Sequence, residues 1–412
     1  MGENASEAGR DWDNVAAVHR ISIISGTRPE ILKLAPVYAA LAKRPEIFAP
    51  TWIATGQHSS LADQAFADFG VKPDMTVELT DVPAGVSAQV GATVAALAPA
   101  LVTSDPELVI VQGDTSSALA GALAAAARGI PVAHVEAGLR SFDFDHPNPE
   151  ESIRVIIARL AQLHFAPTEN AAANLRAEGF SDRRIHVTGN TVVDALLSVL
   201  PTLPAWPETL KAPQEGKRLV LVTTHRRESW GKQIEGIARA VASISDAVPD
   251  AEIILPVHPN PVVRDPLAAV LDTHPGVRLT PPLAYGDFVS VLRRSSLVLT
   301  DSGGVQEEAA TLGVPTLVMR KVTERTEALD AGVAKLVGTD RDDIETLAIH
   351  LLTHETDRQV MAQGGNPFGD GKAGERIASL LAREVGALRV VRSGETEGPD
   401  GAKDGTGRRS AS

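Results

Sequence analysis

The residues best suited to binding phosphate form the block Asp301-Ser302-Gly303-Gly304, which directly follows a short apolar run. Glycine has no Cβ, so a diphosphate can approach the backbone, and the free N–H groups of a helix start attract an anion. Glu308, further along the same expected helix, can accept hydrogen bonds from ribose hydroxyls. The block predicts a nucleotide diphosphate site. The alternative is a tight strand-to-helix turn followed by solvated glutamates.

A second block of the same kind lies near the start of the chain, at Gly26-Thr27-Arg28-Pro29-Glu30, with Lys33 one turn later. Arg28 can form two parallel hydrogen bonds to a phosphate, and Lys33 supplies a compact positive charge. A surface ion pair between Arg28 and Glu30 would also explain the charges. It would not explain why the block lies where open α/β folds bind their ligands, at the carboxyl edge of a sheet.

Acidic side chains follow two further apolar runs. Asp114 and Glu136 come just after neighbouring predicted strands, and Glu150 follows Pro149. Several carboxylates at one cleft have their pKa values pushed apart, which provides an acid and a base. Mg²⁺ binding and helix capping by Asp114 and Glu150 are alternatives that the sequence leaves open. We favour proton transfer.

Histidines end two predicted strands in the second half of the chain. His225 is followed by two arginines, and His258 ends the next strand in a similar way. Histidines at such positions suit proton transfer or phosphate binding. We interpret His146, His164 and His274 as structural.

The elements that must position these residues follow from the alternation of short apolar runs with Ala- and Leu-rich helical stretches. This alternation predicts an α/β fold with two doubly wound, Rossmann-like domains facing a central cleft. The expected strands are 20–26, 51–55, 108–112, 131–135, 163–166, 218–223, 252–257, 277–280, 297–300 and 316–319.

The domain boundaries follow from length and local composition. A chain of 412 residues exceeds one ordinary core, and a proline-rich stretch near its middle is typical of a linker. We expect a disordered leader at 1–17, an N-terminal domain at 18–199, a linker at 200–216, a nucleotide-binding C-terminal domain at 217–372, a helix packing across the domains at 373–390 and a disordered tail at 391–412.

Composition narrows the class of partner and the compartment. The net charge of −13 argues against nucleic acid, whose phosphates require a basic surface. The absence of cysteine excludes disulfides, thiolate nucleophiles and Cys-ligated zinc. The leader lacks the basic start and apolar core of a signal peptide, and we expect no apolar run able to span a bilayer. We therefore expect a cytoplasmic protein with no membrane partner.

Taken together, the blocks resemble the non-hydrolysing UDP-N-acetylglucosamine 2-epimerases, from about Ile21 to Ala387. Each block is weak alone, but their order and spacing are specific. The matching blocks are Gly-Thr-Arg-Pro-Glu at 26–30, Gly-Gln-His at 56–58, Gly-Asp-Thr at 113–115, His-Val-Glu-Ala-Gly-Leu-Arg at 134–140, Pro-Glu-Glu at 149–151, Thr-Gly-Asn-Thr at 188–191, His-Arg-Arg-Glu at 225–228, Val-His-Pro-Asn at 257–260, Asp-Ser-Gly-Gly-Val-Gln-Glu-Glu at 301–308 and Thr-Glu-Arg at 323–325.

The resemblance implies a cytoplasmic homodimer of aminosugar biosynthesis that interconverts UDP-GlcNAc and UDP-ManNAc by elimination and re-addition of UDP, with no cofactor and no metal. It implies that Asp114, Glu136 and Glu150 handle protons and that His225 assists departure of UDP. The residues implied to bind UDP or the sugar are Arg28, Lys33, Arg154, His258, Phe288, Ser302, Gly303, Gly304, Glu308 and Arg325, and a possible allosteric set is Gln57, His58 and Arg226.

Three positions depart from the family pattern. Ile153 stands where an asparagine is usual, Ser59 and Ser60 replace longer polar residues, and Phe368 replaces a tyrosine. The alternatives to an epimerase that retains its intermediate are a hydrolysing relative that releases ManNAc and UDP, a glycosyltransferase, and a nucleotide-sugar-binding regulator without turnover.

Overall fold

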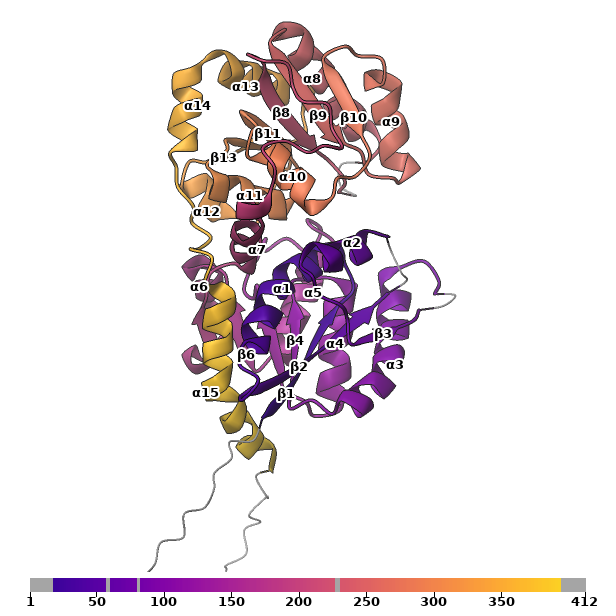
Figure 1. Ribbon diagram of the computed structural model, residues 1–412, viewed down its shortest axis with the longest axis vertical. Helices are drawn as coiled ribbons and strands as arrows, with labels where there is room; N and C mark the ends of the chain where they lie inside the picture. Colours follow the sequence, from indigo (N-terminus) through magenta and orange to yellow (C-terminus); the bar gives the residue numbers. More distant parts are fainter. Residues whose placement is uncertain (1–17, 57–59, 80–81, 227–229, 394–412) are drawn as a thin grey trace, which may run out of the picture.

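The computed structural model describes residues 18–56, 60–79, 82–226 and 230–393. These residues form two α/β halves, stacked one above the other in Figure 1. The expected leader, the tail beyond 393 and the candidate residues Gln57 and His58 lie outside the described residues.

The N-terminal half contains a parallel sheet that has seven strands within the described residues, in the order β3-β2-β1-β4-β5-β6-β7. The strand order reverses between β1 and β4, where α/β sheets open a ligand crevice. The strands are β1 His19–Ser25, β2 Phe48–Thr55, β3 Met75–Val77, β4 Leu108–Gln112, β5 Val132–Val135, β6 Leu163–Ala166 and β7 Ile185–Val187.

The C-terminal half repeats this plan with a parallel sheet of six described strands, in the order β10-β9-β8-β11-β12-β13. Its strand order reverses between β8 and β11. The strands are β8 Arg218–Thr223, β9 Ala251–Pro256, β10 Val277–Thr280, β11 Leu297–Thr300, β12 Thr316–Val318 and β13 Ala334–Leu336.

Helices connect successive strands and cover both sheets (Figure 1). In the N-terminal half they are α1 Arg28–Ala42, α2 Ser60–Asp68, α3 Val86–Ser104, α4 Ser116–Ala127, α5 Glu150–Leu160, α6 Glu169–Ala177 and α7 Thr191–Val199, with 3-10 helices at Asp182–Arg184 and Leu200–Thr202. In the C-terminal half they are α8 Lys232–Ala247, α9 Pro261–Leu271, α10 Tyr285–Leu292, α11 Gly303–Leu312, α12 Thr326–Asp330, α13 Arg341–Thr353 and α14 Glu355–Ala362, followed by α15 Ala373–Ser393.

The continuous apolar runs form strands because both faces of each sheet are buried. On β1, the adjacent residues Ile23 and Ile24 belong to separate apolar clusters, one on each face of the sheet. On β8, Val220 and Leu221 divide in the same way. Period-2 alternation of side chains produces this division, and a strand covered on both faces must be apolar throughout. The predicted fold class is confirmed.

Two segments connect the halves. The stretch expected as a linker packs on the C-terminal half, where Trp206 and Leu210 contact the apolar cluster under α10 and the Trp206 indole donates to the Leu210 carbonyl at 2.8 Å. Helix α15 returns to the N-terminal half and lies along it (Figure 1), packing on α1 and α7. Its first two amides, of Ala373 and Gly374, donate to the Asp194 carboxylate on α7.

Helix α3 is a correction to the sequence analysis. It is long and apolar enough to cross a membrane by length and composition, although we expected no such segment. In the fold it connects β3 to β4 and packs on α4, as a sheet-covering helix does.

Candidate functional site

The two halves enclose a cleft with a volume of about 1350 Å³. Its walls come from the carboxyl ends of the strands, as the sequence predicted. The candidate residues lining it are Arg28, Lys33, Asp114, Glu136, Glu150, His225, Arg226, His258, Phe288, Ser302, Gly303, Gly304, Glu308 and Arg325. Arg154 is the described candidate that lies behind the lining, where it is 2% exposed.

Helix α11 begins in the cleft wall. Its N-cap, Ser302, makes no side-chain capping hydrogen bond. A Cβ added at Gly304 would meet no atom within 4 Å, so this position faces open space. A Cβ at Gly303 would instead lie 2.8 Å from Cζ of Arg325. The two glycines therefore serve different purposes. The missing Cβ of Gly303 leaves room for a buried arginine, and the missing Cβ of Gly304 leaves room in the cleft.

Asp301, which the sequence analysis grouped with the phosphate block, points the other way. Its carboxylate is fully buried and accepts hydrogen bonds from the amides of His225 and Arg226 and from the Thr224 hydroxyl, each at 3.0 Å at its shortest. The His225 ring lies 3.4 Å from the same carboxylate, through Nδ1. Asp301 thus fixes the loop after β8 and orients His225 toward the cleft.

Helix α1 also begins at the cleft, but its start is already occupied. The buried Glu30 carboxylate accepts from the amides of Gly26 at 3.2 Å and Thr27 at 2.7 Å, and from the Ser117 hydroxyl at 2.8 Å. Burial raises the pKa of Glu30, while these hydrogen bonds act in the opposite direction. The alternative considered for this block, an ion pair between Arg28 and Glu30, is not found among the contacts of the described residues. Arg28 instead donates to the Leu283 carbonyl of the opposite half, at 2.9 Å.

Four buried charged side chains close a ring between the halves. Lys33 donates to Glu136 at 2.7 Å and to Glu307 at 2.9 Å. Arg325 donates to the same two carboxylates, at 2.8 Å each. We refer to Lys33, Glu136, Glu307 and Arg325 as the ion ring. The Gln112 amide also bonds to Glu136, so this candidate acid or base is held by three donors.

Asp114 belongs to an adjoining set of ion pairs. Arg154 bonds to Asp114 and lies 3.2 Å from Glu151 and 3.5 Å from Glu324, which ties it to both halves. Glu324 also accepts from Arg325 at 2.5 Å. Burial would raise the pKa of Asp114, but the charges of Arg154 and Arg325 outweigh it and lower the pKa.

The environments of Asp114 and Glu136 push their proton affinities apart. Burial is the main reason that the pKa of Glu136 is raised, and Glu307 adds to the rise. Asp114, by contrast, is held in its charged form. Glu150 lies 3.7 Å from Arg226, and its second oxygen is buried without a hydrogen bond. Such a set of unlike carboxylates suits proton transfer in both directions.

Helix capping, one alternative for Asp114 and Glu150, is not supported at either helix start. Helix α4 is capped by Thr115 and not by Asp114. Glu150 is the first residue of α5, whose N-cap makes no side-chain hydrogen bond. Among the residues that the structure describes, no group of three or more His, Asp or Glu side chains is arranged to hold a metal ion.

Glu308 lies in the middle of α11, with Tyr285 and Arg28 among its neighbours. Burial raises its pKa to about 7, and the neighbouring Glu307 carboxylate adds to the rise. Burial also raises the pKa of Tyr285 well above its usual value, together with the charge of Glu308. A carboxylate with a pKa near neutrality, facing the cleft, can change charge when a ligand arrives.

Several groups that shape the site were not singled out from the sequence. They are Gln112, Glu307, Glu324 and Tyr285. Glu307 and Glu324 stand inside blocks that carried the family resemblance, but no spacing rule marks them as turned inward. Tyr285 is the first residue of α10, and no sequence motif marked it as a site residue.

The structure also describes the side chains at two of the positions that depart from the family pattern. Ile153 lines the cleft and packs into the apolar cluster under α4. Phe368 is 1% exposed and packs between α7 and α11. The side chains of Ser59 and Ser60 lie outside what the structure describes.

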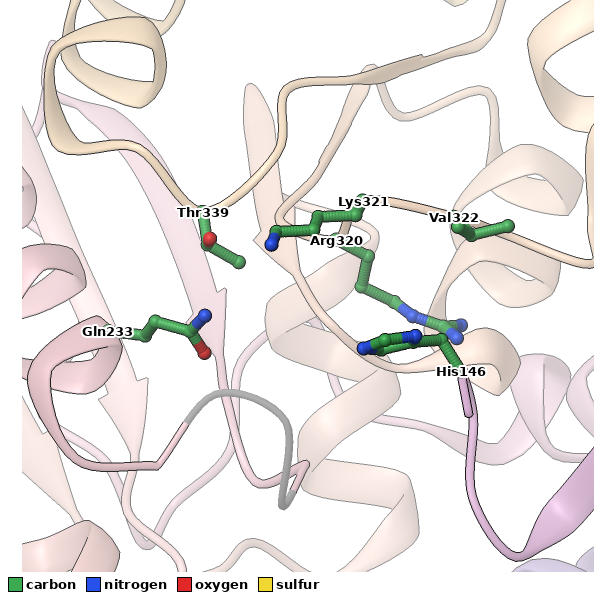
Figure 2. Close-up of a pocket in the computed structure, with 6 residues that line it drawn as sticks. All are labelled: His146, Gln233, Arg320, Lys321, Val322 and Thr339. Carbon is green, nitrogen blue, oxygen red and sulfur yellow. The ribbon is translucent and has the colours of Figure 1, made fainter. Parts of the chain in front are cut away.

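A second pocket, of about 40 Å³, shares His146 with the cleft (Figure 2). The His146 ring lies beside the Arg320 guanidinium, with Gln233 and Thr339 on the facing wall. This space suits one or two water molecules and is far too small for a nucleotide.

The family model described as UDP-N-acetylglucosamine 2-epimerase matches residues 39–382. The chain belongs to this family. The UDP-N-acetylglucosamine 2-epimerase of Escherichia coli strain K12 is 42% identical over 370 residues, covering 88% of this chain and 98% of the relative.

Solved structures of the family share the fold. The Neisseria meningitidis UDP-GlcNAc 2-epimerase bound to UDP-GlcNAc matches with a TM-score of 0.86 at 35% identity, over 88% of this chain and 99% of that one. The Methanocaldococcus jannaschii UDP-GlcNAc 2-epimerase in complex with UDP-GlcNAc and UDP matches with a TM-score of 0.77 at 36% identity, over the same shares. The resemblance found in the sequence is thereby confirmed at the level of the family.

Proposed function

We propose that this chain is a non-hydrolysing UDP-GlcNAc 2-epimerase, which interconverts UDP-GlcNAc and UDP-ManNAc and retains UDP throughout. The observation that carries the proposal is the placement of an uncapped helix start, at Ser302 and Gly304, in the same cleft as Asp114, Glu136 and Glu150. One wall suits a diphosphate, and the other suits proton transfer at the sugar.

The nucleotide occupies the C-terminal wall. The diphosphate lies against the amides at the start of α11, where the helix dipole and free N–H groups stabilise negative charge. Glu308 accepts hydrogen bonds from the ribose, and Phe288 borders the uracil. His225, held by Asp301, assists the departure of UDP, and His258, which also lines the cleft, binds the nucleotide.

The reaction begins with loss of the C2 proton to a carboxylate. The C2–H electrons form the C1=C2 bond of 2-acetamidoglucal, and the C1–O bond breaks with its electron pair going to UDP. The elimination is anti. In the return step a UDP oxygen adds to C1 in a syn addition, and C2 takes a proton on the opposite face. The lowered pKa of Asp114 suits a proton acceptor, and the raised pKa of Glu136 suits a donor.

Two rival activities share the site. A hydrolysing relative would let the glucal react with water and release ManNAc and UDP. A regulator would bind the nucleotide sugar without turnover. Retention is favoured by the enclosure of the cleft between two halves, which keeps the intermediate from water. Turnover is favoured by the buried carboxylates, because binding of an anionic ligand alone gains nothing from them.

The proposal is tested by incubating the protein with UDP-GlcNAc in D₂O and following the products by NMR. We expect UDP-ManNAc to appear, with deuterium at C2 of both sugars and no free ManNAc. Release of ManNAc and UDP would instead identify the hydrolysing activity. Binding of UDP-GlcNAc with neither exchange nor products would identify the regulator. Asp114→Asn, which keeps the shape of the side chain, should abolish exchange while retaining affinity for UDP.

A further inference from the structure

One member of the ion ring, Glu307, belongs neither to the residues proposed to move protons nor to those implied to bind UDP or the sugar. Glu307 lies on α11, is 1% exposed and contacts neither open cleft nor solvent. Its carboxylate accepts from Lys33 at 2.9 Å and from Arg325 at 2.8 Å. A buried carboxylate is costly unless its charge is fully paired, so its presence calls for a physical reason.

The ion ring contains two cations and two anions, and each half of the molecule contributes one of each. Lys33 and Glu136 come from the N-terminal half, and Glu307 and Arg325 come from the C-terminal half. Each cation bonds to both carboxylates, and each carboxylate bonds to both cations, at 2.7 to 2.9 Å. Neither cation therefore belongs to Glu136 alone.

We infer that Glu307 is a positioning residue: by sharing Lys33 and Arg325 with Glu136, it fixes Glu136 against α11 and sets how readily Glu136 gains and loses a proton. The inference rests on the proposed function, in which Glu136 exchanges a proton with the sugar. With Glu307 in place, two cations face two anions, and the proton affinity of Glu136 stays within reach of the reaction.

Other charged and polar groups around Glu136 complete its surroundings. Gln112 at the end of β4 bonds to it directly, and Glu308 is the neighbour of Glu307 on α11. The ion pairs next to the ring begin at Arg325, which bonds to Glu324. Glu324 in turn lies near Arg154, and Arg154 bonds to Asp114. Apart from Glu308, which is changed only in the control, these groups stay unchanged in the variants below, so a change in the pKa of Glu136 can be attributed to the ring.

The two single variants change the charge around Glu136 in opposite directions, so we expect them to shift its pKa in opposite directions. Glu307→Gln leaves two cations facing Glu136, which stabilises its anion and lowers its pKa by about 1–2 units. Lys33→Met leaves two anions facing Arg325, which raises the pKa of Glu136 by a similar amount. The double variant Lys33→Met/Glu307→Gln removes one charge of each sign, so the pKa returns toward that of the parent protein.

The experiment is a titration of the Glu136 carboxyl by NMR, in protein labelled with ¹³C at the glutamate side-chain carboxyl and assigned by loss of the signal in Glu136→Gln. Glu308→Gln is the matched control, since it removes an adjacent charge on the same helix outside the ring and should move Glu136 much less. Thermal unfolding shows which variants are folded. If a single variant does not fold, the double variant, which loses one charge of each sign, still tests the inference.

The expected result is a shift to lower pH in Glu307→Gln, a shift to higher pH in Lys33→Met and restoration in the double variant. In an active enzyme, the limb of the kcat profile that reports Glu136 should move in the same directions. Single variants that leave the titration unchanged, or a double variant that does not restore it, would overturn the inference. Absence of epimerisation in the parent protein would refute the proposed function, while the titration would still test the ring.

Discussion

Helices α1 and α11 both begin at the cleft, each after a strand beside the point where its sheet reverses order, yet a carboxylate of the chain already occupies one of the two starts. At α1 the Glu30 carboxylate already accepts from the amides of Gly26 and Thr27. At α11 the N-cap Ser302 makes no side-chain cap, and Gly304 faces open space. A strand-Gly-helix block therefore does not by itself make a phosphate site. The chain must also leave the helix start unfilled.

The glycines of the two blocks also serve different purposes, one in packing and one in ligand access. A Cβ at Gly26 would lie 2.6 Å from the Thr55 hydroxyl and 2.7 Å from Cβ of Ser117, so its absence serves packing. A Cβ at Gly304 would meet nothing. Its absence serves the ligand.

The largest effect is expected from Gly304→Ala. The added methyl enters the space assigned to the diphosphate, so affinity for UDP should fall by about 10–100-fold, or roughly 1.4–2.7 kcal/mol. Stability should not fall, because alanine favours the helix more than glycine does. Isothermal titration calorimetry with UDP, alongside thermal unfolding, measures both quantities.

Gly303→Ala is the matched control for that prediction. Its Cβ meets the Arg325 guanidinium, so it should lower the melting temperature as well as UDP affinity. If Gly304→Ala also unfolds at lower temperature, or binds UDP as the parent protein does, the assignment of α11 is wrong.

A second effect, on stability instead of affinity, is expected at the other helix start. Glu30→Ala leaves the amides of Gly26 and Thr27 without their acceptor, so the free energy of unfolding should fall by about 1–3 kcal/mol. UDP affinity should stay close to that of the parent protein, because the proposed diphosphate site is the start of α11. Urea unfolding and calorimetry test the two halves of this prediction, and a large loss of UDP affinity without loss of stability would reverse the comparison.

A third effect concerns pH and Glu308. The unfolded chain ionises this carboxyl near pH 4.5, but burial in the folded protein raises its pKa to about 7. The folded state thus holds the proton more tightly, and stability falls as the pH rises from about 4.5 to 7, with no further loss above. Glu308→Gln should match the parent protein in melting temperature at pH 4.5 and exceed it at pH 8.

The same substitution should weaken UDP binding at pH 8, where the ionised carboxylate accepts from the ribose. Thermal unfolding across this pH range and UDP titrations at its ends provide the measurement. A stability difference that shrinks as the pH rises would contradict the assigned burial effect.

The sequence predicted the central strands well because they are buried on both faces and read as continuous apolar runs. It missed β3, β7 and β13, which have three residues each. All three are edge strands, paired on one side, so their residues carry little apolar signal. Their existence depends on a neighbouring strand supplying the ladder.

The site was predictable in location and less so in its pairings. Topology alone places Asp114, Glu136 and the start of α11 at the cleft, since strand ends of parallel sheets meet at one edge. The contact of Lys33 with Glu307 joins residues 274 apart in sequence, across the two halves. Glu307 and Glu308 are adjacent and chemically alike, and only the turn of the helix sends one into the ring and the other to the cleft.

The comparison between the two helix starts is tested most directly by their own amides. Protein labelled with ¹⁵N-glycine, with Gly26 and Gly304 assigned by substitution, can be titrated with UDP and followed by NMR. The account predicts a large shift of the Gly304 amide and little change at Gly26, whose amide stays bonded to Glu30. A shift at Gly26 with none at Gly304 would contradict it.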